Sequence, residues 1–301
     1  NGPPRLAALR AACALAGLAG FLVPRADAHQ GEYVADCDAR LGWLTGFTGS
    51  AGFCIALHHV AGVFVDGRYR VQVRAEVDPT AFTPVNWPEV KPGPWLIEAL
   101  PQGGRVGFDP WLHTEREIAE LRKALAGSQV ELVESANLVD AIWADRPAPP
   151  AAAARIHPPE FAGETSAAKR HRIGAALAVQ GAAAAVLTLP DSISWLLNIR
   201  GADIPRNPVV QAFAVLQADG TLTLFAEAAK FDAELCAHLG PEVTLRPAAA
   251  FAPALRTLAG PVLVDPASAP LAVMRELDET GIAVIRGEDP CIAPKARKNA
   301  A

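Results

Sequence analysis

Three polar segments of this sequence combine arginine with carboxylates close to apolar runs, and they are the first candidates for a binding site. Residues 25–33 read Arg-Ala-Asp-Ala-His-Gln-Gly-Glu-Tyr and directly follow an apolar run. Residues 64–69 read Phe-Val-Asp-Gly-Arg-Tyr, and residues 198–208 carry Arg200 and Asp203 on either side of a glycine. In α/β sheets, ligands usually bind in the loops at the carboxyl ends of strands. These loops are therefore candidates for a ligand-binding site.

Two arginines in these segments allow two interpretations. A guanidinium is a planar fork that suits a carboxylate or a peptide carbonyl, so Arg68 and Arg200 could each be presented to a peptide. Alternatively, each arginine pairs with a local carboxylate and only fixes its own loop. The residues alone leave both interpretations open.

The rest of the sequence shows no complete active site. Residues 46–52, Gly-Phe-Thr-Gly-Ser-Ala-Gly, lack the lysine of a phosphate-binding loop and the first glycine of a nucleophile elbow. We expect them to form a tight turn that enters a buried strand. His58 and His59 are adjacent and would point to opposite faces of a strand, and His171 lies among basic residues on an expected solvated helix face. We find no cluster with the number of ligands that a metal needs, so no catalytic or metal-binding residue is assigned.

Composition excludes several classes of protein. The 301 residues are 51% hydrophobic and 20% charged, enough for packed cores and, by length, for two domains. A net charge of −5 argues against a nucleic-acid or anionic-membrane partner. The five cysteines are dispersed, with no C-x-x-C pair, which indicates unpaired thiols in a reducing, cytoplasmic compartment.

The first residues allow a signal peptide or a helix. Residues 11–23 are apolar but too short to span a bilayer, and Ala26-Asp27-Ala28 resembles a cleavage site. Leu6, Leu9 and Cys13 instead recur at helical spacing. We favour a helix over residues 4–19 followed by a buried strand, because the second half of the chain opens the same way without a signal-like flank.

One order of elements occurs twice, on either side of the proline-rich segment 145–159, which is expected to be a stiff connector. The expected pairs are helices 5–19 and 166–180, strands 21–24 and 184–189, hairpin strands 52–57 with 60–65 and 209–216 with 221–225, and helices 114–125 and 227–239. Asp219-Gly220 predicts a hairpin turn in which both residues have positive φ. The fold class is therefore α/β, with two tandem domains, each a mixed β-sheet flanked by helices. We place the domains at residues 1–157 and 158–301.

Several long stretches, in this order, resemble the N-terminal part of the Xaa-Pro aminopeptidase (aminopeptidase P) family in its three-domain form. They are Val-Pro-Arg-Ala-Asp-Ala-His-Gln-Gly-Glu-Tyr (23–33), Gly-Phe-Thr-Gly-Ser-Ala-Gly (46–52), Val-Asp-Gly-Arg-Tyr (65–69), Asn-Leu-Val-Asp-x-Ile-Trp (137–143), Trp-Leu-Leu-Asn-Ile-Arg-Gly-Ala-Asp-Ile-Pro-x-Asn-Pro-Val (195–209) and Pro-Lys-Ala-x-Lys-Asn (294–299). The resemblance covers essentially the whole chain.

The resemblance implies two creatinase/prolidase-type domains that precede a metallopeptidase domain. In the family, that later domain holds two divalent metal ions, manganese, and hydrolyses the bond before proline. The sequence stops where the family enters this domain, so the resemblance implies an N-terminal fragment without catalytic residues, metal ligands or cofactor of its own. The implied partners are a proline-containing peptide and a second copy of the cytoplasmic full-length protein, with no nucleic acid and no membrane.

The resemblance also implies site residues. Arg68, in the Asp-Gly-Arg-Tyr motif, contributes to peptide binding in the family. Glu32 resembles a supporting residue that orients Arg68 or receives the substrate, and His29 lies in the same loop. Arg200 and Asp203 match the family pattern, and we expect a structural role for them between domains.

Two other functions stay open. The chain could be a stand-alone creatinase-like module for peptide binding or assembly, without catalysis. It could also belong to a relative that acts on another small amide, which the tandem domains disfavour.

Overall fold

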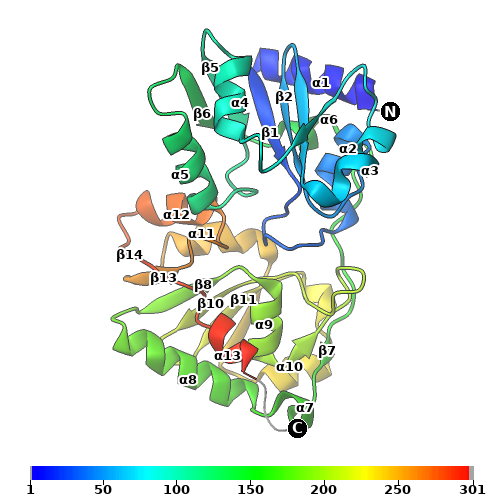
Figure 1. Cartoon of the computed structure of the whole chain (residues 1–301). Helices are drawn as coiled ribbons and strands as arrows, with labels where there is room; N and C mark the ends of the chain where they lie inside the picture. Colours follow the sequence, from blue (N-terminus) through cyan, green and yellow to red (C-terminus); the bar gives the residue numbers. More distant parts are fainter. Residues whose placement is uncertain (1, 298–301) are drawn as a thin grey trace. The chain divides into compact units, whose positions relative to one another are not determined.

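The computed structural model describes residues 2–297, which form two compact units (Figure 1). The first unit runs up to Asp27 and resumes from Asp36 to Pro149. The second unit takes Ala28–Ala35 and the described residues from Pro150 onward. The early segment Ala28–Ala35 is therefore built into the later unit.

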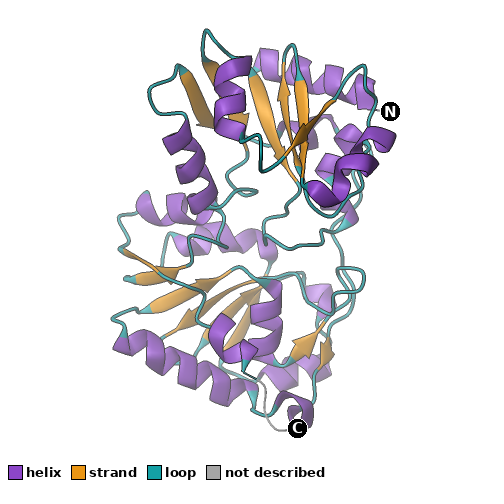
Figure 2. Ribbon diagram, viewed as in Figure 1, coloured by secondary structure: helices purple, strands orange, loops and turns teal. Residues whose placement is uncertain are grey.

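The first unit is a six-stranded mixed sheet with helices on both faces (Figure 2). The strand order is β4-β3-β2-β1-β5-β6. Alternate residues of β3 pack on opposite faces of the sheet. Val63 and Val65 belong to the core that includes α1, whereas the ring of Phe64 contacts Trp95 on α4. Its elements are α1 (Gly2–Leu15), β1 (Gly20–Pro24), α2 (Arg40–Thr45), β2 (Phe53–Leu57), β3 (Ala61–Val65), α3 (Arg70–Glu76), β4 (Thr83–Asn86), α4 (Pro92–Ala99), β5 (Gly104–Phe108), α5 (Glu115–Ala124), β6 (Val130–Glu134) and α6 (Leu138–Ile142), with 3-10 turns η1 (Asp36–Asp38) and η2 (Gly67–Tyr69).

The second unit repeats this sheet and adds a two-stranded ribbon. Its strand order is β12-β11-β10-β8-β13-β14, and β7 pairs with β9 beside the sheet. Its elements are β7 (Arg155–Ile156), α7 (Pro159–Ala162), α8 (Ser166–Val179), β8 (Ala184–Leu187), α9 (Pro190–Leu197), β9 (Ile199–Arg200), β10 (Phe213–Gln217), β11 (Leu222–Phe225), α10 (Ala233–Leu239), β12 (Val243–Arg246), α11 (Phe251–Leu255), β13 (Val262–Val264), α12 (Leu271–Asp278), β14 (Val284–Arg286) and α13 (Ile292–Ala296), with 3-10 turns η3 (Ala228–Lys230) and η4 (Ala248–Ala250).

The two sheets share their strand directions as well as their order. In each sheet the central strand pairs antiparallel with a hairpin strand on one side and parallel with a later strand on the other. The outer strand on either edge is parallel to its neighbour. The prediction of two tandem α/β domains with mixed sheets is confirmed.

The first residues form a helix and a strand, as we favoured. Leu6, Leu9 and Cys13 of α1 are buried in the core of the first unit. The following β1 lies in the interior of the sheet, between β2 and β5. No helix within residues 2–297 is both long enough and apolar enough to cross a membrane.

Three local predictions are wrong for identifiable reasons. The proline-rich segment 145–159 is not a connector over its whole length, because it contains a short strand. Arg155 and Ile156 form β7 and pair with Arg200 and Ile199 of β9. In the hairpin turn only Gly220 has positive φ, at 91°, so the turn places a single residue in the left-handed region. The helix predicted from residue 227 starts only after Asp232, whose side chain accepts from the Leu235 N–H and caps α10.

A buried ion pair fixes the loop after β9. Lys230 Nζ donates to Asp203 Oδ2 over 2.7 Å, and the two side chains are 3% and 0% exposed. The same carboxylate oxygen accepts from the Gln211 N–H over 2.7 Å, and Nζ also donates to the Gln211 carbonyl oxygen. Because both charges are desolvated, each depends on the other for its stability in the fold.

We predict that Lys230→Met lowers the free energy of unfolding by about 3–5 kcal/mol, because the Asp203 charge would stay buried without its partner. Urea unfolding measures the loss. Lys91→Met, at an exposed lysine, is the control and should change stability by less than ~0.5 kcal/mol. The double variant Asp203→Leu/Lys230→Met should recover most of the loss, and a Lys230→Met variant as stable as the parent would contradict the assignment.

Candidate functional site

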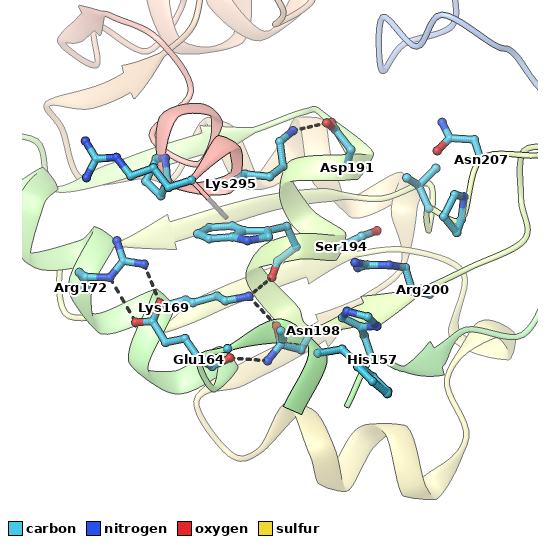
Figure 3. Close-up of a pocket in the computed structure, with 18 residues that line it drawn as sticks. His157, Glu164, Lys169, Arg172, Asp191, Ser194, Asn198, Arg200, Asn207 and Lys295 are labelled. Carbon is cyan, nitrogen blue, oxygen red and sulfur yellow. Dashed lines mark hydrogen bonds and ion pairs between the residues drawn. The ribbon is translucent and has the colours of Figure 1, made fainter. Parts of the chain in front are cut away.

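A cavity of about 820 Å³ lies in the second unit, and the polar segment 198–208 contributes to its wall. The wall is built by the chain between β7 and α8, by helices α8, α9 and α13, by β9 and by the loop after β9 (Figure 3). Its polar and charged side chains include His157, Glu164, Lys169, Arg172, Asp191, Ser194, Asn198, Arg200, Asn207, Lys295 and Arg297. Its apolar side chains include Phe161, Trp195, Pro208, Val209 and Pro294. This mixture suits an organic ligand with both polar and apolar parts.

Helix α9 carries Trp195 and Asn198 to the cavity, and residue types explain its ends. Pro190 lies in the first turn, where its missing N–H costs no hydrogen bond. Asn198 ends the helix with φ 52°, a left-handed conformation that asparagine tolerates better than most residues. Its side-chain Nδ2 donates to the Glu164 carbonyl over 2.8 Å, which ties this helix end to the chain that enters α8.

A buried lysine reaches from α8 to the same helix end. Lys169 is 1% exposed, and its Nζ donates to the Trp195 carbonyl over 2.9 Å and to Asn198 Oδ1 over 2.6 Å. Nζ also lies 4.4 Å from the centroid of the Trp195 ring, a cation–π contact. Burial is the largest influence and lowers the pKa of Lys169 to about 8, against the opposing effect of the Glu164 carboxylate.

Two other cations of the wall have carboxylate partners. Arg172 Nη2 lies 2.7 Å from Glu164 Oε2, and this hydrogen bond is the main reason why the pKa of Glu164 is lowered. Lys295 pairs with Asp191 and joins α13 to the first turn of α9 (Figure 3). These pairs hold the wall together and neutralise the charges that form them.

Arg200 reaches the cavity from β9, and its environment differs from that of Arg172 and Lys295. Its Nη1 donates to the carbonyl oxygen of Ile199 over 2.9 Å, and its register partner on β7 is another arginine, Arg155. Among residues 2–297 no carboxylate pairs with Arg200, so the interpretation in which it fixes its loop through a local carboxylate is wrong. Asp203, from the same segment, is instead buried against Lys230.

Arg68 belongs to the first unit and is held by its own motif. Asp66 caps the turn η2 by accepting from the Arg68 N–H over 2.9 Å, and its carboxylate also accepts from Arg68 Nη2 over 2.7 Å. The guanidinium lies over the Tyr69 ring at 5.1 Å, and the side chain is 64% exposed. The hydrogen bonds from Arg68 are the main reason why the pKa of Asp66 is lowered. Arg68 is therefore exposed but already oriented.

The glycine-rich stretch 46–52 leads from α2 into β2 as an irregular segment that bends at Ser50 and Ala51, and it touches the Arg68 motif. Ser50 Oγ and Tyr69 Oη lie 2.5 Å apart. A Cβ at Gly49 would meet the Phe47 ring at 2.2 Å, so only glycine fits there. Two of the stretches that carry the family resemblance are thus joined by contact within one unit.

His29 and Glu32 belong to the second unit, through the segment Ala28–Ala35. The His29 ring stacks on Phe213 with centroids 4.3 Å apart, and its Nδ1 lies 3.2 Å from the Thr188 carbonyl oxygen. Because a carbonyl only accepts, Nδ1 carries the proton. Glu32 is exposed in the same segment. The structure therefore assigns these two residues to one unit and Arg68 to the other.

Sequence reasoning missed Lys169, although a signal was present. His171 is exposed as expected, but its neighbours Lys169 and Arg170 are buried. The buried positions of α8 recur at the spacing of one helix face and are Ser166, Lys169, Arg170, Ile173, Gly174 and Leu177. Lysine and arginine are rarely buried without partners. The two basic residues therefore made this buried face of α8 resemble a solvent-exposed one.

Comparison with known proteins identifies the class of this chain. Residues 5–142 and residues 145–301 each match a family model described as "Creatinase/Prolidase N-terminal domain". The chain belongs to this family, with two copies of the domain in tandem.

Individual relatives make the similarity more specific. "Aminopeptidase P2" of Arabidopsis thaliana is 33% identical over 273 residues, which cover 86% of this chain and 38% of that protein. A "Probable Xaa-Pro aminopeptidase P" of Coccidioides posadasii is 39% identical over 239 residues, 75% of this chain and 38% of that protein. The chain therefore spans well under half the length of these relatives.

A solved structure agrees with these relatives. The X-prolyl aminopeptidase of Caenorhabditis elegans, described as a cytosolic enzyme with a di-nuclear active site, is 28% identical with a TM-score of 0.92. The match covers 100% of this chain and 52% of that one. Within residues 2–297, no group of three or more His, Cys, Asp or Glu side chains could hold a metal ion. The described residues therefore do not fit a di-nuclear centre; Lys298 and Asn299 of the last matching stretch lie outside them.

We predict that Lys169 makes stability depend on pH. Its pKa is about 8 in the fold and 10.5 ordinarily, so between these pH values the unfolded chain binds more protons and raising the pH favours the fold. The free energy of unfolding should rise by up to ~3 kcal/mol relative to a Lys169→Met variant, in which this contribution is absent. Urea unfolding of both proteins at pH 7.5 and pH 10 measures the difference, and parallel pH profiles would contradict the prediction.

Proposed function

We propose that this chain is the N-terminal part of a metal-dependent Xaa-Pro aminopeptidase, which hydrolyses the bond between an N-terminal residue and a following proline. The observation that carries the proposal is the similarity of the whole chain to the X-prolyl aminopeptidase structure, together with the relatives named for the same activity. Those relatives are longer than this chain, and we assign the two metal ions, manganese, to polypeptide outside it. In this proposal the chain as given is catalytically silent.

In the proposed enzyme, the two units of this chain supply surfaces for substrate access and for dimerisation. The full-length protein is a cytoplasmic homodimer, and its partner molecule is a proline-containing peptide. The description of a similar enzyme as cytosolic supports the cytoplasmic location in this proposal.

Arg68 is the residue that we propose for peptide binding. Its guanidinium can donate in a planar geometry to a peptide carbonyl or carboxylate. Because Asp66 and the Tyr69 ring already restrict its side chain, less conformational entropy would be lost when a peptide binds. We also propose Glu32 and His29 as peptide-binding residues. Glu32 is an exposed residue of the segment Ala28–Ala35, and His29 holds this segment on the second unit through Phe213.

In the full-length parent enzyme, Arg68→Ala should lower kcat/KM for an Xaa-Pro peptide by roughly ten- to a hundred-fold. The reason is the loss of a charged hydrogen bond to the substrate, worth ~1.5–3 kcal/mol. Arg116→Ala, at an exposed arginine on α5 of the same unit, is the matched control and should leave kcat/KM unchanged. An unchanged value for Arg68→Ala would return Arg68 to a purely structural role.

The 301-residue chain should show no turnover of an Xaa-Pro peptide when manganese is added. The full-length parent provides the positive control under the same conditions. Turnover by the shorter chain that a chelator abolishes would mean that it carries a metal site of its own. A parent reading frame that ends at Ala301 would instead favour the non-catalytic binding module.

A further inference from the structure

The strongest unexplained feature of the cavity is an uncompensated positive charge. Arg155 and Arg200 are register partners on the antiparallel strands β7 and β9, and like charges directly opposite each other on a sheet repel. Within residues 2–297 neither arginine pairs with a carboxylate, in contrast to Arg172 and Lys295 on the same wall. Figure 3 shows Arg200 between Ser194 and His157, joined by no interaction to another residue drawn.

Neighbouring groups respond to this charge. Burial lowers the pKa of Arg200, and Arg155 lowers it further. Burial also lowers the pKa of His157, followed by the charges of Arg200, Lys169 and Arg155, against a smaller opposing effect of the Glu160 carboxylate. The proton is thus disfavoured on His157, while the Arg200 guanidinium keeps its charge at neutral pH. This side of the cavity is electropositive and partly desolvated, so an anion there would gain more than it would in water.

The side chains beside Arg200 indicate which chemical class of anion would fit the cavity. The indole of Trp195 and the ring of Pro208 line the cavity as apolar surfaces, and Asn207 adds an amide. The volume of about 820 Å³ lies in the range of sites for organic ligands, well above the size of a simple ion. A guanidinium binds a carboxylate through two parallel hydrogen bonds.

We propose that the second unit binds an organic carboxylate in this cavity, with Arg200 as the group that receives the carboxylate and Trp195 and Pro208 in contact with an apolar body. The ligand is either a small organic acid or the C-terminal carboxylate of a short peptide, because both present the same group. This site goes beyond the proposed peptidase activity and does not depend on it.

Isothermal titration calorimetry of the 301-residue chain tests the proposal. The probes are hippurate, the tripeptide Ala-Pro-Phe with a free carboxylate, and the same tripeptide with a C-terminal amide. Binding of either carboxylate supports the site, and the probe that binds identifies the source of the carboxylate. Amidation should abolish binding of the tripeptide. Failure of both carboxylates to bind at millimolar concentration, or equal binding of the amide, would overturn the proposal.

Variants locate the binding. Arg200→Gln should weaken binding of the carboxylate at least ten-fold, whereas Arg200→Lys should weaken it less because it keeps the charge. Arg246→Gln, at an exposed arginine on β12 of the same unit, should bind like the parent. Circular dichroism melting checks that each variant is folded, and Arg200→Lys keeps the test valid if Arg200→Gln is not. Affinity that none of these changes alters would refute the role of Arg200. Catalysis enters none of these measurements, so the outcome is independent of the peptidase proposal.

Discussion

Each unit of this protein depends on one arrangement, in which a cation from its first long helix lies on a tryptophan ring and donates to that tryptophan's own carbonyl oxygen. In the first unit, Arg5 lies 4.5 Å from the Trp43 ring and donates to the Trp43 carbonyl. In the second unit, Lys169 does the same with Trp195. A helix end leaves carbonyl oxygens short of partners, and a cation withdrawn from water, half-buried as Arg5 is or buried as Lys169 is, needs acceptors. The contact satisfies both requirements. It connects α1 to α2 in the first unit and α8 to α9 in the second.

The two copies diverge at the residue that follows this arrangement. Helix α2 ends at Gly46 with φ 85°, and α9 ends at Asn198 with φ 52°, so both use a left-handed residue to stop the helix. Glycine adds nothing further to the first unit. Asparagine adds an amide that accepts from Lys169 and donates to Glu164, and this amide contributes to the cavity wall. One difference of residue type between the two copies thus adds one amide to the cavity wall of the second unit.

The order of helices and strands could be predicted from the sequence because it depends on local patterns of a few residues. Apolar runs of strand length and the helical spacing of Leu6, Leu9 and Cys13 both act over a few residues. The burial of Lys169 and the pairing of Asp203 with Lys230 could not be foreseen in the same way. Each depends on partners far along the chain, Trp195 and Asn198 for one and Lys230 for the other. The register that sets Arg155 opposite Arg200 is likewise a long-range property.

The octapeptide Ala28–Ala35 makes the polypeptide pass from one unit to the other three times, between residues 27 and 28, 35 and 36, and 149 and 150. Its His29 ring covers Phe213, which itself stacks on Phe251. During synthesis on the ribosome this segment emerges long before the aromatic surface that it covers, so the second unit is completed by residues made early. A protease that cuts only the proline-rich segment would therefore leave a piece of the second unit's fold on the fragment that carries the first unit.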